Sequence, residues 1–340
     1  MKIKLLSMKG DCAVIEHPID LYYLTGLSLS RGMLLVTAQE SVLFVDGRYL
    51  AKAQKEAPCP VQLWEGDAPI RWLQENHSKT IEFDSAKTSY EEFTHLQKKL
   101  GNIELIPTPS LLKRQRGVKR PDEIAALRRA ADVTWKGYKH IAGLLKEGVS
   151  EKELAMEFEF FVRKAGASEL SFPPIIAFGE NSAFPHYPAG EAKLKKNQIV
   201  LMDLGAVVDQ YRGDLTRVHF FGKVDPELEN MLAWTQQAQK AAIDAVRPGT
   251  PISELNRLAR GVFAEHGVLD LFVHGLGHGV GLEIHEFPSL KVDSPDQTVL
   301  LEPGMVFTIE PGLYRPGLGG VRWEDMVLVT SNGSEKLFPS

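Results

Sequence analysis

The stretch Ile199-Val-Leu-Met-Asp203-Leu-Gly-Ala-Val-Val208 places an acidic residue inside an apolar run that is otherwise typical of a fully buried β-strand. A lone buried carboxylate costs several kcal/mol, so Asp203 must be paired, protonated or bound to a metal ion. Asp214 follows beyond a turn-like segment, Val208-Asp-Gln-Tyr-Arg-Gly213. Folding a hairpin about that turn brings Asp203 and Asp214 roughly opposite one another on one face. Such a pair calls for a cation between the carboxylates; the alternative is that one of them is exposed at the turn.

A second stretch repeats this arrangement. Met305-Val-Phe-Thr-Ile-Glu310 predicts a strand that ends in a carboxylate, and the following proline favours an extended backbone at Glu310. A Gly/Pro-rich turn, Arg315-Pro-Gly-Leu-Gly-Gly320, leads to Val321-Arg-Trp-Glu324-Asp. Folding this hairpin about Gly317 places Glu324 opposite Glu310. Two hairpins that each present a pair of acids inside apolar strands indicate a site.

A third signal is the histidine-rich segment His274-Gly-Leu-Gly-His278-Gly-Val-Gly-Leu-Glu-Ile-His285. His274 and His278 would share one face of a helix, but the alternating glycines favour an extended segment. A nucleotide loop is a poor interpretation, because Val280 stands where the dinucleotide fingerprint needs its third glycine. His186, in the loop Phe184-Pro-His-Tyr-Pro188, is a further candidate, with a plain surface-loop histidine as the alternative.

The donor types predict the kind of cofactor. Four carboxylates and one imidazole form a mainly oxygen ligand set, which suits Mn²⁺, Fe²⁺ or Co²⁺, with Zn²⁺ possible, and argues against a cysteine-type zinc site. The four acids, Asp203, Asp214, Glu310 and Glu324, carry a charge of −4, which one divalent ion cannot neutralise and two can. We therefore expect two divalent metal ions, manganese first among them, that share carboxylates and activate a water molecule.

Composition limits the classes of protein. The 340 residues suggest two domains, and 44% hydrophobic with 24% charged residues is typical of a globular chain. The net charge of −5 argues against a nucleic-acid partner, and residues 1–115 are electrically neutral. The longest apolar stretches are far shorter than the ~20 residues of a membrane span. With no signal-peptide pattern and two cysteines, we expect a cytoplasmic protein with no membrane partner.

The pattern of strands and helices changes along the chain. Residues 1–115 alternate short apolar strands (12–15, 32–37, 41–46 and 80–84) with helices (49–56, 68–76 and 89–100), which predicts a small three-layer α/β domain. The basic run 113–120 is interpreted as a solvated linker. Beyond it we expect helices that begin at Pro121, at Ser150 with a capping box to Glu153, at Pro226, and at Ser253 as N-cap, and that cover a mainly antiparallel sheet.

With these residues in view, the chain resembles the pita-bread metallopeptidases, and among them the proline peptidases: Xaa-Pro dipeptidase (prolidase) and aminopeptidase P. The motifs that carry the resemblance are Asp203-x-Gly, Gly213-Asp-x-Thr-Arg217, His274-Gly-x-Gly-His-Gly-x-Gly-Leu-x-x-His-Glu-x-Pro288, Glu310-Pro-Gly-x-Tyr314 and Val321-Arg-x-Glu-Asp325. Tyr22-Tyr-Leu-Thr-Gly26 and Val45-Asp-Gly-Arg-Tyr49 match the creatinase-type N-terminal domain. The one departure is a compact N-terminus without the family's leading helix.

The resemblance implies an α/β two-domain fold. It assigns residues 1–115 to a creatinase-like N-terminal α/β domain and residues 116–340 to a pita-bread α+β catalytic domain with an antiparallel sheet. It implies hydrolysis of the Xaa-Pro bond in proline-containing di- or oligopeptides, by a homodimer. The metal ligands that it implies are Asp203, Asp214, His278, Glu310 and Glu324. Of these, Asp214 and Glu324 would bridge the two ions, Asp203 would chelate one ion, and His278 would bind the other.

The same resemblance implies the catalytic and substrate-binding residues. His186 would shuttle a proton or stabilise the transition state, His285 would hydrogen-bond the substrate carbonyl or the developing oxyanion, and Glu310 would act as general base. His274 would line the pocket for the proline ring, Tyr314 would line the same pocket, and Arg322 would orient an acidic ligand.

Three other activities are weighed against the dipeptidase. Aminopeptidase P would accept longer peptides, whereas a dipeptidase needs a cation for the substrate's C-terminal carboxylate, for which Lys291 is the candidate. A metal-free creatinase-like hydrolase or a binding pseudo-enzyme would have lost one of the five ligands, and all five are present. Methionine aminopeptidases normally lack the N-terminal domain.

Overall fold

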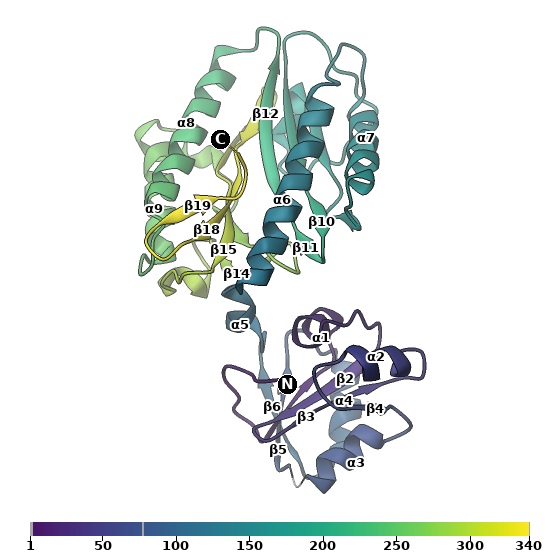
Figure 1. Cartoon of the computed structure of the whole chain (residues 1–340). Helices are drawn as coiled ribbons and strands as arrows, with labels where there is room; N and C mark the ends of the chain where they lie inside the picture. Colours follow the sequence, from purple (N-terminus) through teal and green to yellow (C-terminus); the bar gives the residue numbers. More distant parts are fainter. Residues whose placement is uncertain (1–2, 77, 340) are drawn as a thin grey trace. The chain divides into compact units, whose positions relative to one another are not determined.

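The computed structural model describes residues 3–76 and 78–339. These residues form two compact units, which divide between Arg116 and Gly117 (Figure 1). Both units combine helices with sheets, so the chain is the expected two-domain α/β protein.

The N-terminal unit is built around a six-stranded mixed sheet in the order β4-β3-β2-β1-β5-β6. Its strands are β1 (Cys12–Ile15), β2 (Gly32–Thr37), β3 (Ser41–Val45), β4 (Val61–Leu63), β5 (Thr80–Asp84) and β6 (Glu104–Thr108). Its helices are α1 (Pro18–Thr25), α2 (Leu50–Glu56), α3 (Ala68–Glu75) and α4 (Tyr90–Leu100), and α5 (Lys113–Gly117) follows at the division. Successive residues of β2 face opposite sides of the sheet. Met33 packs with α3 and α4 in one apolar cluster, and Leu34 packs with α1 and α2 in another. The predicted three layers are confirmed.

The C-terminal unit carries four long helices: α6 (Pro121–Ala142), α7 (Glu151–Lys164), α8 (Pro226–Asp244) and α9 (Ile252–Glu265). Short 3₁₀ helices lie at η1 (Gly179–Ala183), η2 (Leu269–Leu271) and η3 (Pro295–Thr298). Its first strands are β7 (Glu169–Leu170), β8 (Ile175–Phe178), β9 (Gln198–Leu204), β10 (Ala206–Val208), β11 (Tyr211–Arg212) and β12 (Leu215–Phe221). The later ones are β13 (His278–Gly279), β14 (Glu286–Ser289), β15 (Val306–Ile309), β16 (Gly312–Arg315), β17 (Gly319–Arg322), β18 (Asp325–Val329) and β19 (Ser334–Lys336).

Strand pairing in this unit is antiparallel, as predicted. One sheet has the order β12-β9-β8 and another the order β14-β13-β15-β18-β19, with all of these neighbours antiparallel. Helices α6 and α7 lie together beside the first sheet, and α8 and α9 lie together beside the second (Figure 1). Ser150 caps α7 in the predicted capping box with Glu153.

The first acidic hairpin has a more elaborate turn than expected. Between β9 and β12 the chain forms a small extra hairpin, β10–β11, whose tip residues Asp209 and Gln210 both have positive φ. Thr216, and not Asp214, therefore lies directly opposite Asp203. Asp214 precedes Thr216 by two residues, so it still lies on the same face as Asp203. The predicted shared face is right, and the predicted register is displaced by two residues.

The second acidic hairpin has the expected register. Ile309 pairs with Asp325 in β15–β18, and Gly312 pairs with Arg322 in β16–β17. Glu310 and Glu324 lie between these two pairs and therefore oppose one another. Their carboxylates come from a stretch where the strands leave one sheet and enter a two-stranded ribbon.

Two local predictions are wrong. The basic run 113–120 is not a solvated linker, because Arg116 and Lys119 are buried and each pairs with a carboxylate, Arg116 with Asp20 at 2.9 Å and Lys119 with Glu286 at 2.8 Å. Ser253 is not an N-cap: α9 begins at Ile252, after Pro251, with no side-chain cap.

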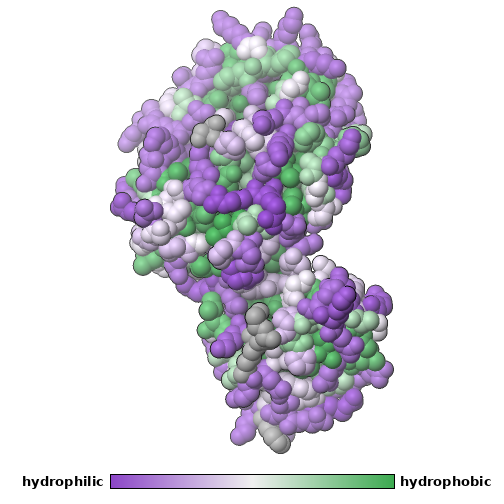
Figure 2. Space-filling view, viewed as in Figure 1, coloured by the Kyte–Doolittle hydropathy of each residue, from purple (hydrophilic) through white to green (hydrophobic). Residues whose placement is uncertain are grey.

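The visible surface of each unit carries hydrophilic side chains interspersed with apolar ones (Figure 2). Over the described residues, no helix combines the length and the apolar character needed to cross a membrane.

Candidate metal centre

In the C-terminal unit, the two acidic hairpins lie next to the histidine-rich segment. Ligand atoms of Asp214, His278 and Glu324 all lie within 4.8 Å of one another. His278 Nε2 lies 3.5 Å from an Asp214 oxygen and 3.3 Å from a Glu310 oxygen. Asp203 extends the cluster, because it lies directly opposite Thr216, whose hydroxyl donates to Glu324 at 2.6 Å. The structure therefore brings the five predicted ligands together.

The protonation of His278 is set by its backbone neighbour. Its Nδ1 lies 3.1 Å from the carbonyl oxygen of Gly279, which can only accept a hydrogen bond, so Nδ1 carries the proton. Burial lowers the pKa of His278 to about 4, which keeps the ring neutral near pH 7. The lone pair of Nε2 thus points at carboxylate oxygens of Asp214 and Glu310. Lone pairs facing one another at these distances repel unless a proton or a metal ion lies between them.

The buried carboxylates show the same requirement. Burial raises the pKa of Asp214 well above its usual range, and the charges of Glu324 and Asp203 raise it further. Burial and the neighbouring charges of Glu310 and Asp203 do the same to the pKa of Glu324. Like charges this close destabilise each other unless protons or metal ions neutralise them.

Asp203 contributes an oxygen that is left for a ligand. Its Oδ2 accepts a hydrogen bond of 2.6 Å from Arg322 Nη2. Its Oδ1 is buried and has no hydrogen-bond partner among the described residues. A buried carboxylate oxygen without a donor costs free energy, and a metal ion would supply the missing partner. The donor set therefore fits hard divalent cations.

Arg322 connects the acids to the aromatic side of the site. Its Nη1 donates to the Tyr314 hydroxyl at 2.6 Å, and Tyr314 lies 2.9 Å from His274 Nε2. His274 Nδ1 lies 2.8 Å from the carbonyl oxygen of Gly275, so it carries the ring proton, and Nε2 accepts from Tyr314. Burial lowers the pKa of His274. Both ring nitrogens of His274 therefore have hydrogen-bond partners within the protein.

His285 and His186 lie at the accessible side of the centre. The His285 ring stands edge-on to His278, with 4.3 Å between ring centroids, and His285 itself is exposed. Partial burial lowers the pKa of His285. His186 is exposed in the loop after η1. Pro185 holds this loop near the acids, because its carbonyl oxygen accepts from Arg322 at 3.4 Å.

The glycines of the histidine-rich segment are explained by close backbone packing. A Cβ at Gly277 would lie 2.0 Å from the carbonyl oxygen of Thr308, and one at Gly279 would lie 2.2 Å from that of Phe287. The segment is extended at His278, where β13 lies between β14 and β15. The expectation of an extended segment holds for His278 and Gly279, whereas His274 lies at a bend, and the glycines bring His278 up to β15, which Glu310 follows.

Several polar residues to which the sequence assigned no role contact the ligands. Thr216 donates to Glu324 at 2.6 Å and Thr308 donates to Glu310 at 3.2 Å. Arg217 donates to the backbone carbonyl of Glu324 and forms a buried ion pair of 2.7 Å with Asp325. The available signal was spacing: each threonine lies two residues from a predicted ligand in a strand, and residues two apart share a face.

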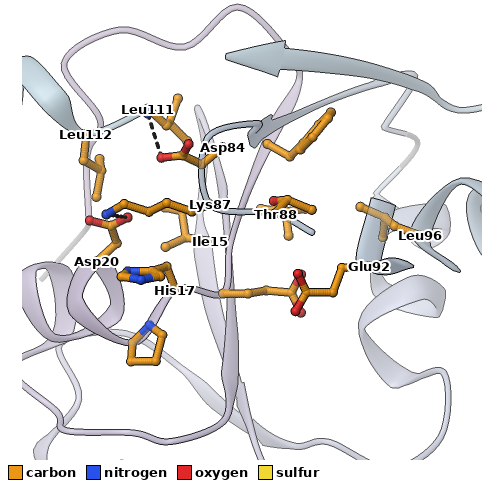
Figure 3. A pocket seen from close by; sticks show the side chains of 14 residues that line it. Ile15, His17, Asp20, Asp84, Lys87, Thr88, Glu92, Leu96, Leu111 and Leu112 are labelled. Carbon is orange, nitrogen blue, oxygen red and sulfur yellow. Dashed lines mark hydrogen bonds and ion pairs between the residues drawn. The ribbon is translucent and has the colours of Figure 1, made fainter. Parts of the chain in front are cut away.

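A separate cavity lies in the N-terminal unit, at the end of β1 and β5. It has a volume of about 120 Å³, and its wall includes Asp20, Asp84 and Lys87 (Figure 3). Lys87 lies 3.0 Å from Asp20, and Asp84 accepts from the backbone N–H of Leu111. Lys87 and Asp20 form an ion pair, backbone N–H groups hold Asp84, and none of the predicted site residues lines this cavity.

Comparisons with known proteins agree with this geometry. Residues 4–118 match the creatinase/prolidase N-terminal domain and residues 125–331 match metallopeptidase family M24. An Xaa-Pro dipeptidase of Pyrococcus furiosus is 35% identical over 328 residues, covering 96% of this chain and 93% of the relative.

Two solved structures extend the comparison. The Xaa-Pro dipeptidase from Bacillus anthracis superposes with a TM-score of 0.93 at 32% identity, over 97% of this chain and 93% of that one. The X-Pro aminopeptidase from Thermotoga maritima superposes with a TM-score of 0.90 at 28% identity, over 98% and 96%. From the two matching domains, the shared pita-bread fold and the carboxylate–histidine cluster, the chain belongs to metallopeptidase family M24 and carries a creatinase/prolidase N-terminal domain.

Proposed function

We propose that this chain is an Xaa-Pro dipeptidase that uses two divalent metal ions, manganese first among them. The observation that carries the proposal is the neutral His278, whose Nε2 faces oxygens of Asp214 and Glu310 at 3.5 and 3.3 Å. Together with Asp203 and Glu324, these ligands carry four negative charges, which two divalent ions balance. Asp214 and Glu324, the most deeply placed of the acids, are proposed as the bridging ligands.

The metal ions, when bound, would supply Lewis acidity that polarises the scissile carbonyl and eases deprotonation of the attacking water. Glu310, the most exposed of the four acids with 17% of its side chain accessible, is proposed as the general base for that water. His285 is proposed to hydrogen-bond the substrate carbonyl as it gains negative charge. His186 is proposed to donate a proton to the leaving proline nitrogen.

The similarity to Xaa-Pro dipeptidases supports the proposed substrate class, and the Xaa-Pro bond has a shape that needs its own pocket. Its nitrogen is tertiary, with no hydrogen, and the ring restricts the backbone, so a dedicated pocket must accept the ring. His274 and Tyr314 are proposed to form that pocket, since their hydrogen bonds fix both rings beside Arg322.

Lys291 supports the dipeptidase over aminopeptidase P. It is exposed, and the residue before it, Leu290, exchanges backbone hydrogen bonds with Leu276 and Gly277 of the histidine-rich segment. Its Cγ lies 2.8 Å from where a Cβ at Gly275 would stand, next to His274. A cation there would hold the C-terminal carboxylate of a dipeptide.

The activity is tested by release of free alanine from Ala-Pro and from Ala-Pro-Ala after Mn²⁺ is added to the purified protein. We expect cleavage of Ala-Pro with the higher kcat/KM. A higher value for the tripeptide identifies an aminopeptidase P instead, and cleavage of neither contradicts both. If elemental analysis finds no transition metal and reconstitution with Mn²⁺ restores no activity, the chain is a metal-free creatinase-like hydrolase or a binding pseudo-enzyme instead.

Lys291→Met tests the carboxylate anchor. We expect it to raise KM for Ala-Pro and to leave KM for Ala-Pro-Ala unchanged. In the tripeptide the C-terminal carboxylate lies one residue beyond the proline, out of reach of Lys291. Lys240→Met is the matched control, since Lys240 pairs with Asp244 on the exposed face of α8. Equal changes for both substrates would contradict the anchor.

The expected homodimer stays a prediction, which light scattering of the purified protein tests.

A further inference from the structure

Thr216 lies between a fixed cationic donor and a predicted metal ligand. It is fully buried in β12. Arg322 Nε lies 3.0 Å from its hydroxyl oxygen and can only donate. The hydroxyl must therefore accept from Arg322, and its single proton is directed to Glu324 Oε2, 2.6 Å away. The direction of this hydrogen-bond chain is fixed: Arg322 to Thr216 to Glu324.

Thr308 has the same arrangement at the other hairpin. It is also fully buried, in β15. The backbone N–H of His278 donates to its hydroxyl oxygen at 3.1 Å, so its proton is directed to Glu310 Oε1 at 3.2 Å. Thr308 precedes Glu310 by two residues, as Thr216 follows Asp214 by two. Each hairpin thus contributes one buried hydroxyl that links a rigid N–H donor to a carboxylate.

We propose that Thr216 and Thr308 are matched positioning residues that orient Glu324 and Glu310 for metal binding. The inference rests on the proposed metal site. One oxygen of each carboxylate is held by a hydroxyl whose proton can point in only one direction, so the side chain cannot rotate freely about its last bond. Binding a cation then requires less reorganisation of the ligand.

The two chains also link one ligand to another. Arg322 donates to Asp203 as well as to Thr216, so Asp203 and Glu324 are held by the same guanidinium group. Through Thr308, the backbone of His278 holds Glu310. Partners of this kind behind metal ligands typically contribute ~10–100-fold to metal affinity or activity when they are removed.

Valine has nearly the shape of threonine but has no hydroxyl. Thr216→Val and Thr308→Val therefore remove the hydrogen bond to the carboxylate and keep the packing. Thr216→Ser and Thr308→Ser restore the hydroxyl and lose only a methyl group. Thr235→Val is the matched control, because Thr235 is fully buried in α8 and its hydroxyl has no hydrogen-bond partner among the described residues. Thermal melts show whether each variant folds.

The test is calorimetric titration of the metal-free full-length protein with Mn²⁺, which needs no activity readout. We expect each valine variant to bind at least one Mn²⁺ ~10–100-fold more weakly, each serine variant to recover the wild-type affinity, and Thr235→Val to match wild type. The inference is overturned if the folded valine variants bind as wild type does, or if serine and valine are equally weak. Wild-type protein that takes up no Mn²⁺ would instead contradict the proposed function. If one valine variant does not fold, the pair at the other threonine decides the inference.

Discussion

Arg322 donates a hydrogen bond of 2.6 Å to Asp203, and both side chains are buried. The same guanidinium group reaches the Tyr314 hydroxyl and the Thr216 hydroxyl through two other nitrogens. Three N–H directions of one rigid side chain therefore orient a predicted metal ligand, a predicted pocket residue and a hydroxyl that holds a second ligand. Only a planar, multivalent donor can do this from one position.

We expect Arg322→Lys to weaken Mn²⁺ binding and to lower kcat by ~10–100-fold, although the positive charge is kept, because a lysine ammonium cannot reach all three partners at once. Metal content and steady-state kinetics measure the two effects. Arg257→Lys is the control, since Arg257 pairs with Glu254 on the exposed side of α9. Normal affinity and kcat in Arg322→Lys would show that charge alone suffices.

Metal binding is expected to release protons. Burial and mutual repulsion raise the pKa values of Asp214 and Glu324, so the metal-free protein holds protons on these acids where ordinary carboxyl groups have lost them. His278 contributes none, because its pKa is lowered to about 4 and it is already neutral. Since a cation displaces the carboxyl protons, apparent Mn²⁺ affinity should rise with pH.

Calorimetry in two buffers of different ionisation enthalpy measures the released protons. The observed heat should differ between the buffers for wild type. The difference should shrink in Asp214→Asn, whose side chain cannot titrate. Identical heats for wild type in both buffers would mean that the acids are already ionised before the metal binds.

The buried ion pair of Lys119 and Glu286 is expected to be important for stability. Its side chains are 1% and 7% exposed, and the two atoms lie 2.8 Å apart. Lys119→Met removes the cation that lies 2.8 Å from the Glu286 carboxylate, and breaking a buried ion pair costs ~3–5 kcal/mol in typical cases. Denaturant unfolding measures the loss as a lower free energy of unfolding of the C-terminal unit. Lys136→Met, which breaks the exposed pair with Asp132, should change little. An equal, small effect of both variants would argue against this role.

The contrast between these two ion pairs shows where sequence reasoning fails. Local patterns predicted the capping box of Ser150 and Glu153 and the strand around Asp203, because both depend on neighbouring residues. The basic run was misinterpreted because the partner of Lys119 lies 167 residues away in the sequence. Nothing within the run itself indicates that its cations are buried.

The site shows the same division. The facing carboxylates could be predicted, because an acidic residue inside an apolar strand is rare and needs a partner. The displaced register opposite Asp203 depends on two positive-φ residues, Asp209 and Gln210, which form an extra hairpin. Thr216 and Thr308 were missed because threonine is common in strands, and only the fold shows which carboxylate each one contacts.

His278 and His186 should separate metal binding from the chemical step. A metal ligand must be neutral, and His278 directs its lone pair at the carboxylates, so His278→Ala should lower both Mn²⁺ content and activity. His186 lies in the exposed loop after η1, next to Pro185, whose carbonyl oxygen accepts from Arg322. His186→Ala should therefore keep the metal and the fold, while kcat falls by ~10²–10⁴-fold as a positioned proton donor is lost. Metal stoichiometry and kcat, measured on the same preparation of each variant, make the comparison. If His186→Ala keeps a near-normal kcat with its metal bound, His186 is a loop histidine with no part in the reaction.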